Sequence, residues 1–486
     1  MPDVRYVILS DLHFGAENSV LTDVLPGRRV ADPNQPGPAM EALVDCLRDL
    51  LAHNEDRSPP TLVLGGDMLE FALALDNVAA MVFERFVELT MAGPDRLFAP
   101  TIYFVPGNHD HHLWEAAREA HYARHVASVP RGQPLKVPPH TTPMFGARDE
   151  DPTEAQLLTA LVHRSGAKDL VVQTVYPNLA FLSDDGRKGL IFHHGHFVES
   201  MYRLMSVLNE LMFDHPTEPD IIEWEAENFA WIDFFWSTLG RSGDVGLDVA
   251  LIYESLQSQA ATDRLVARLA DGLANRIREG RVRRLVARRV LTAALKFAVS
   301  HASDRERRKT GTVLSANAQR GLHEYLEGPL RNQLVVECNG DPPSELTFAF
   351  GHTHKPFVDV LDLSRYPNPV TVMNTGGWVV DGLEPEPLHG AGAILVDEDM
   401  HTLLFHFYAQ RAHASEYRAV IEAPPGSPDS EFARRVTEII ESSPELWGRF
   451  SNTVAGVVAQ RNQELADTIA GRPVVWQSDT GVSTPT

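Results

Sequence analysis

The stretch Phe104-Val105-Pro106-Gly107-Asn108-His109-Asp110 organises the interpretation of the whole sequence. An apolar run typical of a β-strand stops at Pro106-Gly107, which breaks the strand. The polar triplet Asn108-His109-Asp110 therefore follows the carboxyl end of a predicted strand. In an α/β protein this is the edge of the sheet at which ligands bind.

Four further apolar runs end in the same way, each passing directly into Asp or His. Asp11-Leu12-His13 follows Tyr6–Leu9, Gly66-Asp67 follows Leu62–Leu64, His194-Gly195-His196 follows Leu190–Phe192, and Gly351-His352-Thr353-His354 follows Leu346–Phe350. Carboxylate, imidazole and amide groups are ligands of borderline divalent metals. The five strand ends together predict a metal site assembled at one edge of a sheet.

The pattern of elements divides the chain into parts. Strands and helices alternate over residues 3–108, which predicts a mostly parallel sheet covered by helices. Strand signals recur between residues 171 and 193, with a turn signal at Asp184-Asp185-Gly186 that predicts a hairpin. From residue 197, helical periodicity without strand signals takes over until strands return near residue 346. We therefore expect a catalytic core in two parts, 1–196 and 346–410. An α-helical insertion over 197–345 would form a cap, and helices and a tail would follow over 411–486.

Net charge and composition limit the kinds of partner molecule that we expect this protein to bind. The net charge of −23 disfavours binding to nucleic acid, so no specific nucleic-acid partner is expected. The segment from Asp263 to Lys309 differs, with 14 Lys and Arg against 5 Asp and Glu. The default interpretation of this segment is a solvated helix face. Its arginines could instead bind the phosphate of a substrate, or the segment could make peripheral contact with an anionic membrane. The aromatic stretch Trp224–Trp236 favours helix core over lipid contact.

We recognise neither a signal peptide nor a transmembrane segment in the sequence. The first predicted strand begins close to Met1, and no apolar run reaches transmembrane length. The expectation is a cytoplasmic protein whose oligomeric state stays open.

The chemistry of the predicted site favours hydrolysis of a phosphate ester or anhydride. Asp67 has two carboxylate oxygens and can bridge two metal ions. A pair of ions about 3.5–4 Å apart clamps the attacking and leaving oxygens of an in-line displacement and makes hydroxide available at neutral pH. Mn²⁺, Fe and Zn²⁺ all suit this set of ligands.

Taken in order, the motifs resemble the calcineurin-like metallophosphoesterases over residues 3–196 and 346–408. The resemblance implies a four-layer α/β/β/α sandwich, here with a large helical insertion and C-terminal helices, and two divalent ions, with Mn²⁺ the first choice. By position, one ion would take Asp11, His13, Asp67 and His354, and the other Asp67, Asn108, His194 and His352. His109 would protonate the leaving group, and Asp110 would orient His109. Asn374–Trp378 is similar to the Asn-x-Gly segment that follows the last ligands in this family.

Residues 10–15 and 66–70 are also similar to the branch that contains the UDP-diacylglucosamine pyrophosphohydrolases. This chain is longer and its insertion larger, so that substrate is not assigned. For His111, His112 and His196, substrate contact and a supporting role both stay open.

The function expected from these observations is a metal-dependent phosphohydrolase. It would cleave a phosphodiester, phosphomonoester or pyrophosphate bond by attack of a metal-bridging hydroxide, with His109 assisting the leaving group. The alternatives are a nuclease of the same superfamily and a non-catalytic scaffold with this fold. A scaffold should have lost ligands or the catalytic histidine, and this sequence retains all of them.

Overall fold

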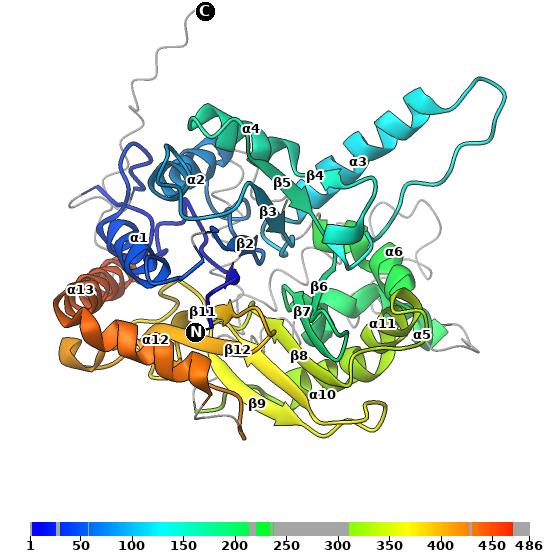
Figure 1. Ribbon diagram of the computed structural model, residues 1–486. Coiled ribbons are helices and arrows are strands. Elements are labelled where there is room, and N and C mark those ends of the chain that lie inside the picture. Colours follow the sequence, from blue (N-terminus) through cyan, green and yellow to red (C-terminus); the bar gives the residue numbers. More distant parts are fainter. Residues whose placement is uncertain are drawn as a thin grey trace, which may run out of the picture.

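A computed structural model describes residues 2–25, 30–56, 58–212, 220–233, 237, 311–426 and 430–469. These residues form two β-sheets with helices along their outer faces (Figure 1). The strands come from both ends of the sequence, so that each sheet joins segments from before and after the predicted insertion.

The first sheet has eight strands in the order β13-β12-β11-β1-β2-β3-β5-β4. Their bounds are β1 Tyr6–Leu9, β2 Thr61–Leu64, β3 Thr101–Phe104, β4 Thr153–Glu154, β5 Val171–Thr174, β11 Gly390–Val396, β12 Thr402–Ala409 and β13 Val420–Glu422. The predicted parallel pairing is confirmed for β1, β2, β3 and β5. The complete sheet is mixed, however, because β11 pairs antiparallel with β1, and β12 and β13 continue that pattern.

The second sheet has five strands in the order β6-β7-β8-β10-β9. Their bounds are β6 Asn178–Leu182, β7 Lys188–His193, β8 Glu345–Phe350, β9 Phe357–Leu361 and β10 Val370–Asn374. The turn signal at Asp184-Asp185-Gly186 joins β6 and β7 as an antiparallel hairpin, as predicted. The parallel neighbours β7 and β8 flank the predicted insertion in the sequence. Their pairing brings His194 and Gly351 together, and the N–H of Gly351 donates to the carbonyl of His194 at 2.8 Å.

Helices cover the outer face of the first sheet. These are α1 Pro38–Leu51, α2 Asp76–Thr90, α4 Gln156–Arg164, α12 Glu431–Ser442 and α13 Pro444–Ile469. In α1 a proline stands in the first turn, where its missing N–H costs nothing, and Leu43, Leu47 and Leu50 bury one face. The apolar cluster they join extends to Phe405 of β12 and Phe450 of α13, so the C-terminal helices are part of the main core.

A separate apolar cluster fills the space between the sheets, with Ile8 and Ile394 from the first and Phe192 and Ala349 from the second. Strand side chains alternate between faces, so β1, β7 and β8 each supply residues to two clusters. The carboxyl ends of strands from both sheets are therefore held together by one packed interior.

The outer face of the second sheet packs against helices from the predicted insertion. These are α5 Leu204–Met212, α6 Ile221–Ile232, α10 Ala316–Tyr325 and α11 Arg331–Glu337. Trp224 of α6 is buried and its ring stacks 6.0 Å from that of Tyr325, which in turn lies 6.1 Å from Phe348 of β8. The prediction of a helix core is confirmed for Trp224. The domain boundaries themselves stay predictions.

The basic segment 263–309 lies outside the described residues, and membrane contact through it stays a prediction. In the described part of the chain, no helix combines the length and hydropathy needed to cross a bilayer.

Candidate metal centre

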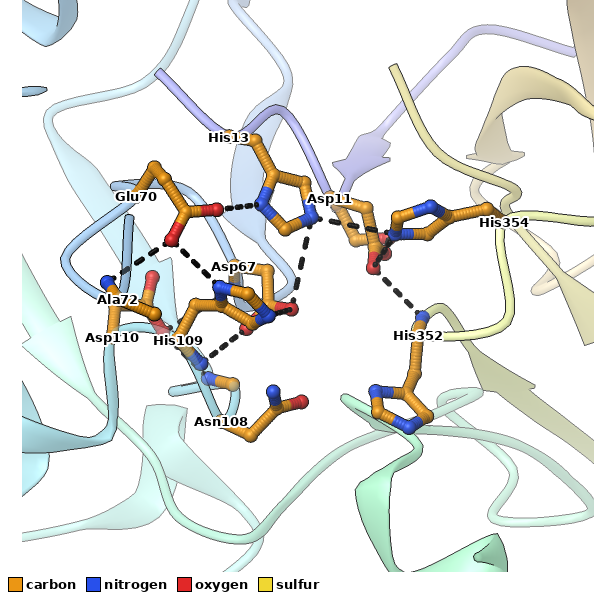
Figure 2. Close-up of polar contacts among 12 residues, drawn as sticks. Asp11, His13, Asp67, Glu70, Ala72, Asn108, His109, Asp110, His352 and His354 are labelled. Atoms are coloured by element: carbon orange, nitrogen blue, oxygen red, sulfur yellow. Dashed lines mark hydrogen bonds and ion pairs between the residues drawn. The ribbon is translucent and has the colours of Figure 1, made fainter. Parts of the chain in front are cut away.

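The five predicted motifs converge where strands β1, β2, β3, β7 and β8 end. Figure 2 shows the side chains of four of these motifs. Backbone hydrogen bonds tie the loops after β1 and β2 together, with Asp11 N–H donating to Gly66 at 3.0 Å and His13 N–H to Asp67 at 2.9 Å. Side chains link the other loops, since Asp67 Oδ1 accepts from His109 N–H at 2.8 Å and Asp11 Oδ1 from His352 N–H at 2.9 Å. Each loop is therefore positioned by its neighbours.

The backbone at this centre is unusual. Positive φ angles occur at Asp11 (53°), His13 (46°), Asp67 (50°), His352 (67°) and His354 (59°). A residue with a side chain rarely adopts this left-handed conformation, and each instance costs about 1–3 kcal/mol. Strain of this kind concentrates at functional sites, where the surrounding structure enforces it.

The side chains form two adjoining groups of buried metal-ligand type. The first comprises Asp11, His13 and His354, and the second Asp67, His194 and His352; within each group the ligand atoms lie within 4.8 Å of one another. Asp67 lies between the groups, with its Oδ2 3.8 Å from His13 Nε2 and 3.4 Å from His194 Nε2. Asn108 is fully buried and its Oδ1 lies 3.2 Å from His194 Nε2. All seven residues predicted as ligands are thus brought together.

Each histidine is held through the nitrogen that faces away from the centre. His13 Nδ1 contacts Glu70 Oε2 at 2.7 Å, His354 Nδ1 contacts Asp381 Oδ2 at 2.9 Å and His194 Nδ1 contacts the Gly65 carbonyl at 3.1 Å. His352 is held through Nε2, 2.7 Å from Glu199 Oε1. A metal-ligating histidine characteristically donates its other N–H to a carboxylate or carbonyl. The arrangement leaves His13, His194 and His354 with Nε2 toward the centre.

The ionisation of the carboxylates fits bound cations. Burial raises the pKa of a carboxyl, but hydrogen bonds and charge from the neighbouring histidines outweigh it here. The pKa of Asp11 therefore lies below its ordinary value and that of Asp67 well below. Two buried carboxylates, four imidazoles and an amide are a donor set suited to two divalent transition-metal ions.

Glu70 links the ligand set to the predicted catalytic histidine. Its Oε1 lies 2.7 Å from His109 Nδ1, while its Oε2 holds His13. Burial opposes ionisation of Glu70, but the charges and hydrogen bonds of His109 and His13 lower its pKa well below the ordinary value. The carboxylate is therefore ionised, and Nδ1 of His109 carries the hydrogen that it accepts. His109 Nε2 then points toward the centre, 4.0 Å from Asp67 Oδ2.

The prediction that Asp110 orients His109 is corrected by this contact. The carboxylate of Asp110 instead accepts backbone N–H groups from Gly107 at 2.7 Å and from Met68 at 2.8 Å. Asp110 thereby fastens the loop after β3 to the loop after β2. The three carboxylates that hold the histidines were not identified from the sequence. Glu70 could have been found only from its position three residues after Asp67, and nothing in the sequence pointed to Asp381 or Glu199.

At Gly351 the loop after β8 lies very close to the side chains of Asp11 and Ser10. A Cβ placed on Gly351 would overlap the Asp11 carboxylate and the hydroxyl of Ser10. The absence of a side chain at this position is what allows the loop after β8 to approach Asp11.

His196 is a buried neighbour of the centre. Its ring lies 5.8 Å from that of His194 and 5.9 Å from that of Tyr202. Burial lowers its pKa well below the ordinary value, so the imidazole is neutral. Its position is compatible with either of the roles left open for it.

Buried clusters of Asp and His at the strand ends of an α/β fold are typical of the active site of a metal-dependent phosphoesterase. A family model described as calcineurin-like phosphoesterase matches residues 4–251, and the chain belongs to this family. The match includes Asp11, Asp67, Asn108 and His194, whereas His352 and His354 lie beyond it. It is a match to the family as a whole and does not distinguish its branches. No curated protein matches the sequence.

Proposed function

We propose that this protein is a dinuclear phosphohydrolase that cleaves a phosphodiester, phosphomonoester or pyrophosphate bond. The observation that carries the proposal is the position of Asp67 between the two ligand groups, 3.8 Å from His13 Nε2 and 3.4 Å from His194 Nε2. A carboxylate so placed can offer one ligand atom to each of two ions.

Asp11, His13, Asp67 and His354 would hold one ion, and Asp67, Asn108, His194 and His352 the other. We propose Mn²⁺ ahead of Fe or Zn²⁺, because the set mixes carboxylate and amide oxygens with imidazole. Bound divalent ions would neutralise charge on the phosphoryl group and activate water as the nucleophile.

His109 would supply the proton for the leaving group. Glu70 accepts from Nδ1 and fixes the ring, so that Nε2 faces the space beside Asp67. A proton carried on Nε2 would thus be available to a phosphoryl leaving oxygen beside Asp67, and general acid catalysis of this kind contributes about 10²–10⁴-fold.

The insertion would act as a cap that selects substrates. Its first residues already reach the centre, since Glu199 holds His352 and the Tyr202 ring lies 5.1 Å from that of His352. The proposal stops at the phosphoester class and does not extend to the substrate of the UDP-diacylglucosamine branch. A cytoplasmic location stays a prediction.

The test is to purify the protein without chelator, measure its metals and assay bis(p-nitrophenyl) phosphate and p-nitrophenyl phosphate with Mn²⁺. Asp67→Ala should lose metal and turnover, and His109→Ala should lose turnover. Matched controls are Asp359→Ala and His413→Ala, both at exposed positions. The site variants should differ from both controls.

A chain that binds no metal and hydrolyses neither ester after reconstitution would contradict the proposal and favour the scaffold. Bound metal with neither ester cleaved would point instead to a selective substrate. Affinity for DNA that falls steeply as the salt concentration rises would favour the alternative that the protein is a nuclease.

A further inference from the structure

A second cluster of metal-ligand type lies where helix α3, His111–Ser128, begins. His111, His112 and Glu115 come from its first two turns, and Asp233 stands at the end of α6. His112 Nδ1 lies 3.3 Å from Glu115 Oε2 and 3.8 Å from Asp233 Oδ1, and His111 Nδ1 lies 3.6 Å from the same Asp233 oxygen. The proposed phosphohydrolase chemistry uses none of these four residues.

His111 is oriented as a ligand would be. The residue is fully buried, and its Nε2 is held 3.1 Å from the Tyr176 hydroxyl. Its Nδ1 faces Asp233 and, as far as the described residues show, makes no hydrogen bond; the same is true of His112 Nδ1. A buried nitrogen without a hydrogen bond costs about 1–3 kcal/mol, so two of them beside the one carboxylate of Asp233 favour an occupant that both can bind.

The spacing of the donor atoms suits a tetrahedral ion. Zn²⁺ binds imidazole nitrogen and carboxylate oxygen at about 2.0–2.2 Å, which places neighbouring ligand atoms about 3.4 Å apart. The separations here run from 3.3 to 3.8 Å. The ligand atoms of His112, Glu115 and Asp233 already lie within 4.8 Å of one another, whereas His111 lies outside this group and would have to move closer to complete the set.

We propose that His111, His112, Glu115 and Asp233 bind a third divalent metal ion of the Zn²⁺ type, separate from the dinuclear centre. Two imidazoles and two carboxylates would supply the four ligands of a tetrahedral set, since Zn²⁺ binds both His nitrogen and Asp or Glu oxygen.

The ion would fasten the insertion to the catalytic core. The two parts already touch here, because His112 N–H donates to Ser237 Oγ at 2.9 Å and the Phe229 ring lies 5.1 Å from that of His111. Helix α3 begins directly after Asp110, whose carboxylate secures the loop that carries His109. A metal that joins α3 to α6 would thus fix the cap relative to the catalytic loop.

The experiment measures zinc per chain after metal-free protein is reconstituted with Zn²⁺ and passed through gel filtration. His112→Ala and Asp233→Asn should each hold one zinc ion fewer than the wild type. Glu119→Gln, an exposed position one turn further along α3, is the matched control and should retain the full complement. Circular dichroism of the metal-free proteins verifies that each variant is folded.

Asp67→Ala separates this site from the dinuclear centre, because it should still bind the zinc ion that His112→Ala loses. Crystals of the wild type measured at the zinc edge should show an anomalous peak between His112 and Asp233. Equal zinc content in the wild type, His112→Ala and Asp233→Asn, or no peak at that position, would overturn the proposal and leave the cluster as a metal-free network of ion pairs.

Discussion

Oε1 of Glu70 lies 2.7 Å from Nδ1 of His109, so that a carboxylate on the loop after β2 sets the orientation of an imidazole on the loop after β3. Both residues are buried, and the other oxygen of Glu70 holds His13. One side chain therefore couples the ligand set to the proposed acid.

Glu70→Gln should lower kcat/KM by about 10–100-fold, as is usual when a residue that orients a ligand is changed. The amide can accept from one histidine only, so that the other loses its partner. The loss should be larger for esters with poor leaving groups, which depend most on protonation. Rates for a series of leaving groups test this, with Glu88→Gln at an exposed position as control. An equal loss across the series would argue that Glu70 acts through His13 alone.

Asp110→Ala should destabilise the fold more than His109→Ala. The Asp110 carboxylate accepts buried N–H groups from Gly107 and Met68, and each donor left without a partner costs about 1–3 kcal/mol. Denaturant unfolding of the metal-free proteins gives the two free energies of unfolding. If His109→Ala proved the more destabilising, the fastening role assigned to Asp110 would be wrong.

Gly351→Ala should reduce metal binding, because the added Cβ overlaps the Asp11 carboxylate. Elemental analysis after reconstitution measures the effect. Gly448→Ala is the control: it lies in α13 with open space around its Cβ, and alanine favours a helix interior by about 1 kcal/mol. That variant should bind metal normally and unfold at a slightly higher temperature. Normal metal content in Gly351→Ala would show that the loop can move aside.

Phe450→Ala should cost about 3–5 kcal/mol of stability, because it empties part of the main core. Phe450 is buried and its ring lies 5.8 Å from that of Phe407 in β12. Turnover at low temperature should persist, since the centre lies at the strand ends. Asn452→Ala, an exposed neighbour on the same helix, should change neither property. A cost below about 1 kcal/mol, far under the usual range for this substitution, would mean that α13 is only loosely attached.

Mn²⁺ should raise the unfolding temperature, because an ion that binds only the folded state stabilises it. The gain is about 2.7 kcal/mol at a concentration 100 times the dissociation constant. Differential scanning calorimetry with Mn²⁺ and then with excess chelator should show a reversible shift, much reduced in Asp67→Ala. An unchanged shift in that variant would place the binding elsewhere.

Much of the site could be predicted because its information is local. Asp11, Asp67 and Asn108 each follow an apolar strand, and parallel strands present their carboxyl ends at one edge. The helix core at Trp224 was likewise readable from residue type. The role given to Asp110 was wrong because adjacency to His109 in sequence does not determine which group its carboxylate faces.

The sequence by itself determined the strands, the residues that end them and the chemistry those residues can support, since strand propensity and chain breaks act over a few residues. The tertiary structure alone decided the partners of these side chains. Glu199 and Asp381 reach His352 and His354 only because the chain folds back across large separations. The proximity of Asp233 to His111 likewise exists only after α6 packs against α3. Such contacts depend on the sum of many packing interactions, which no short stretch of sequence encodes.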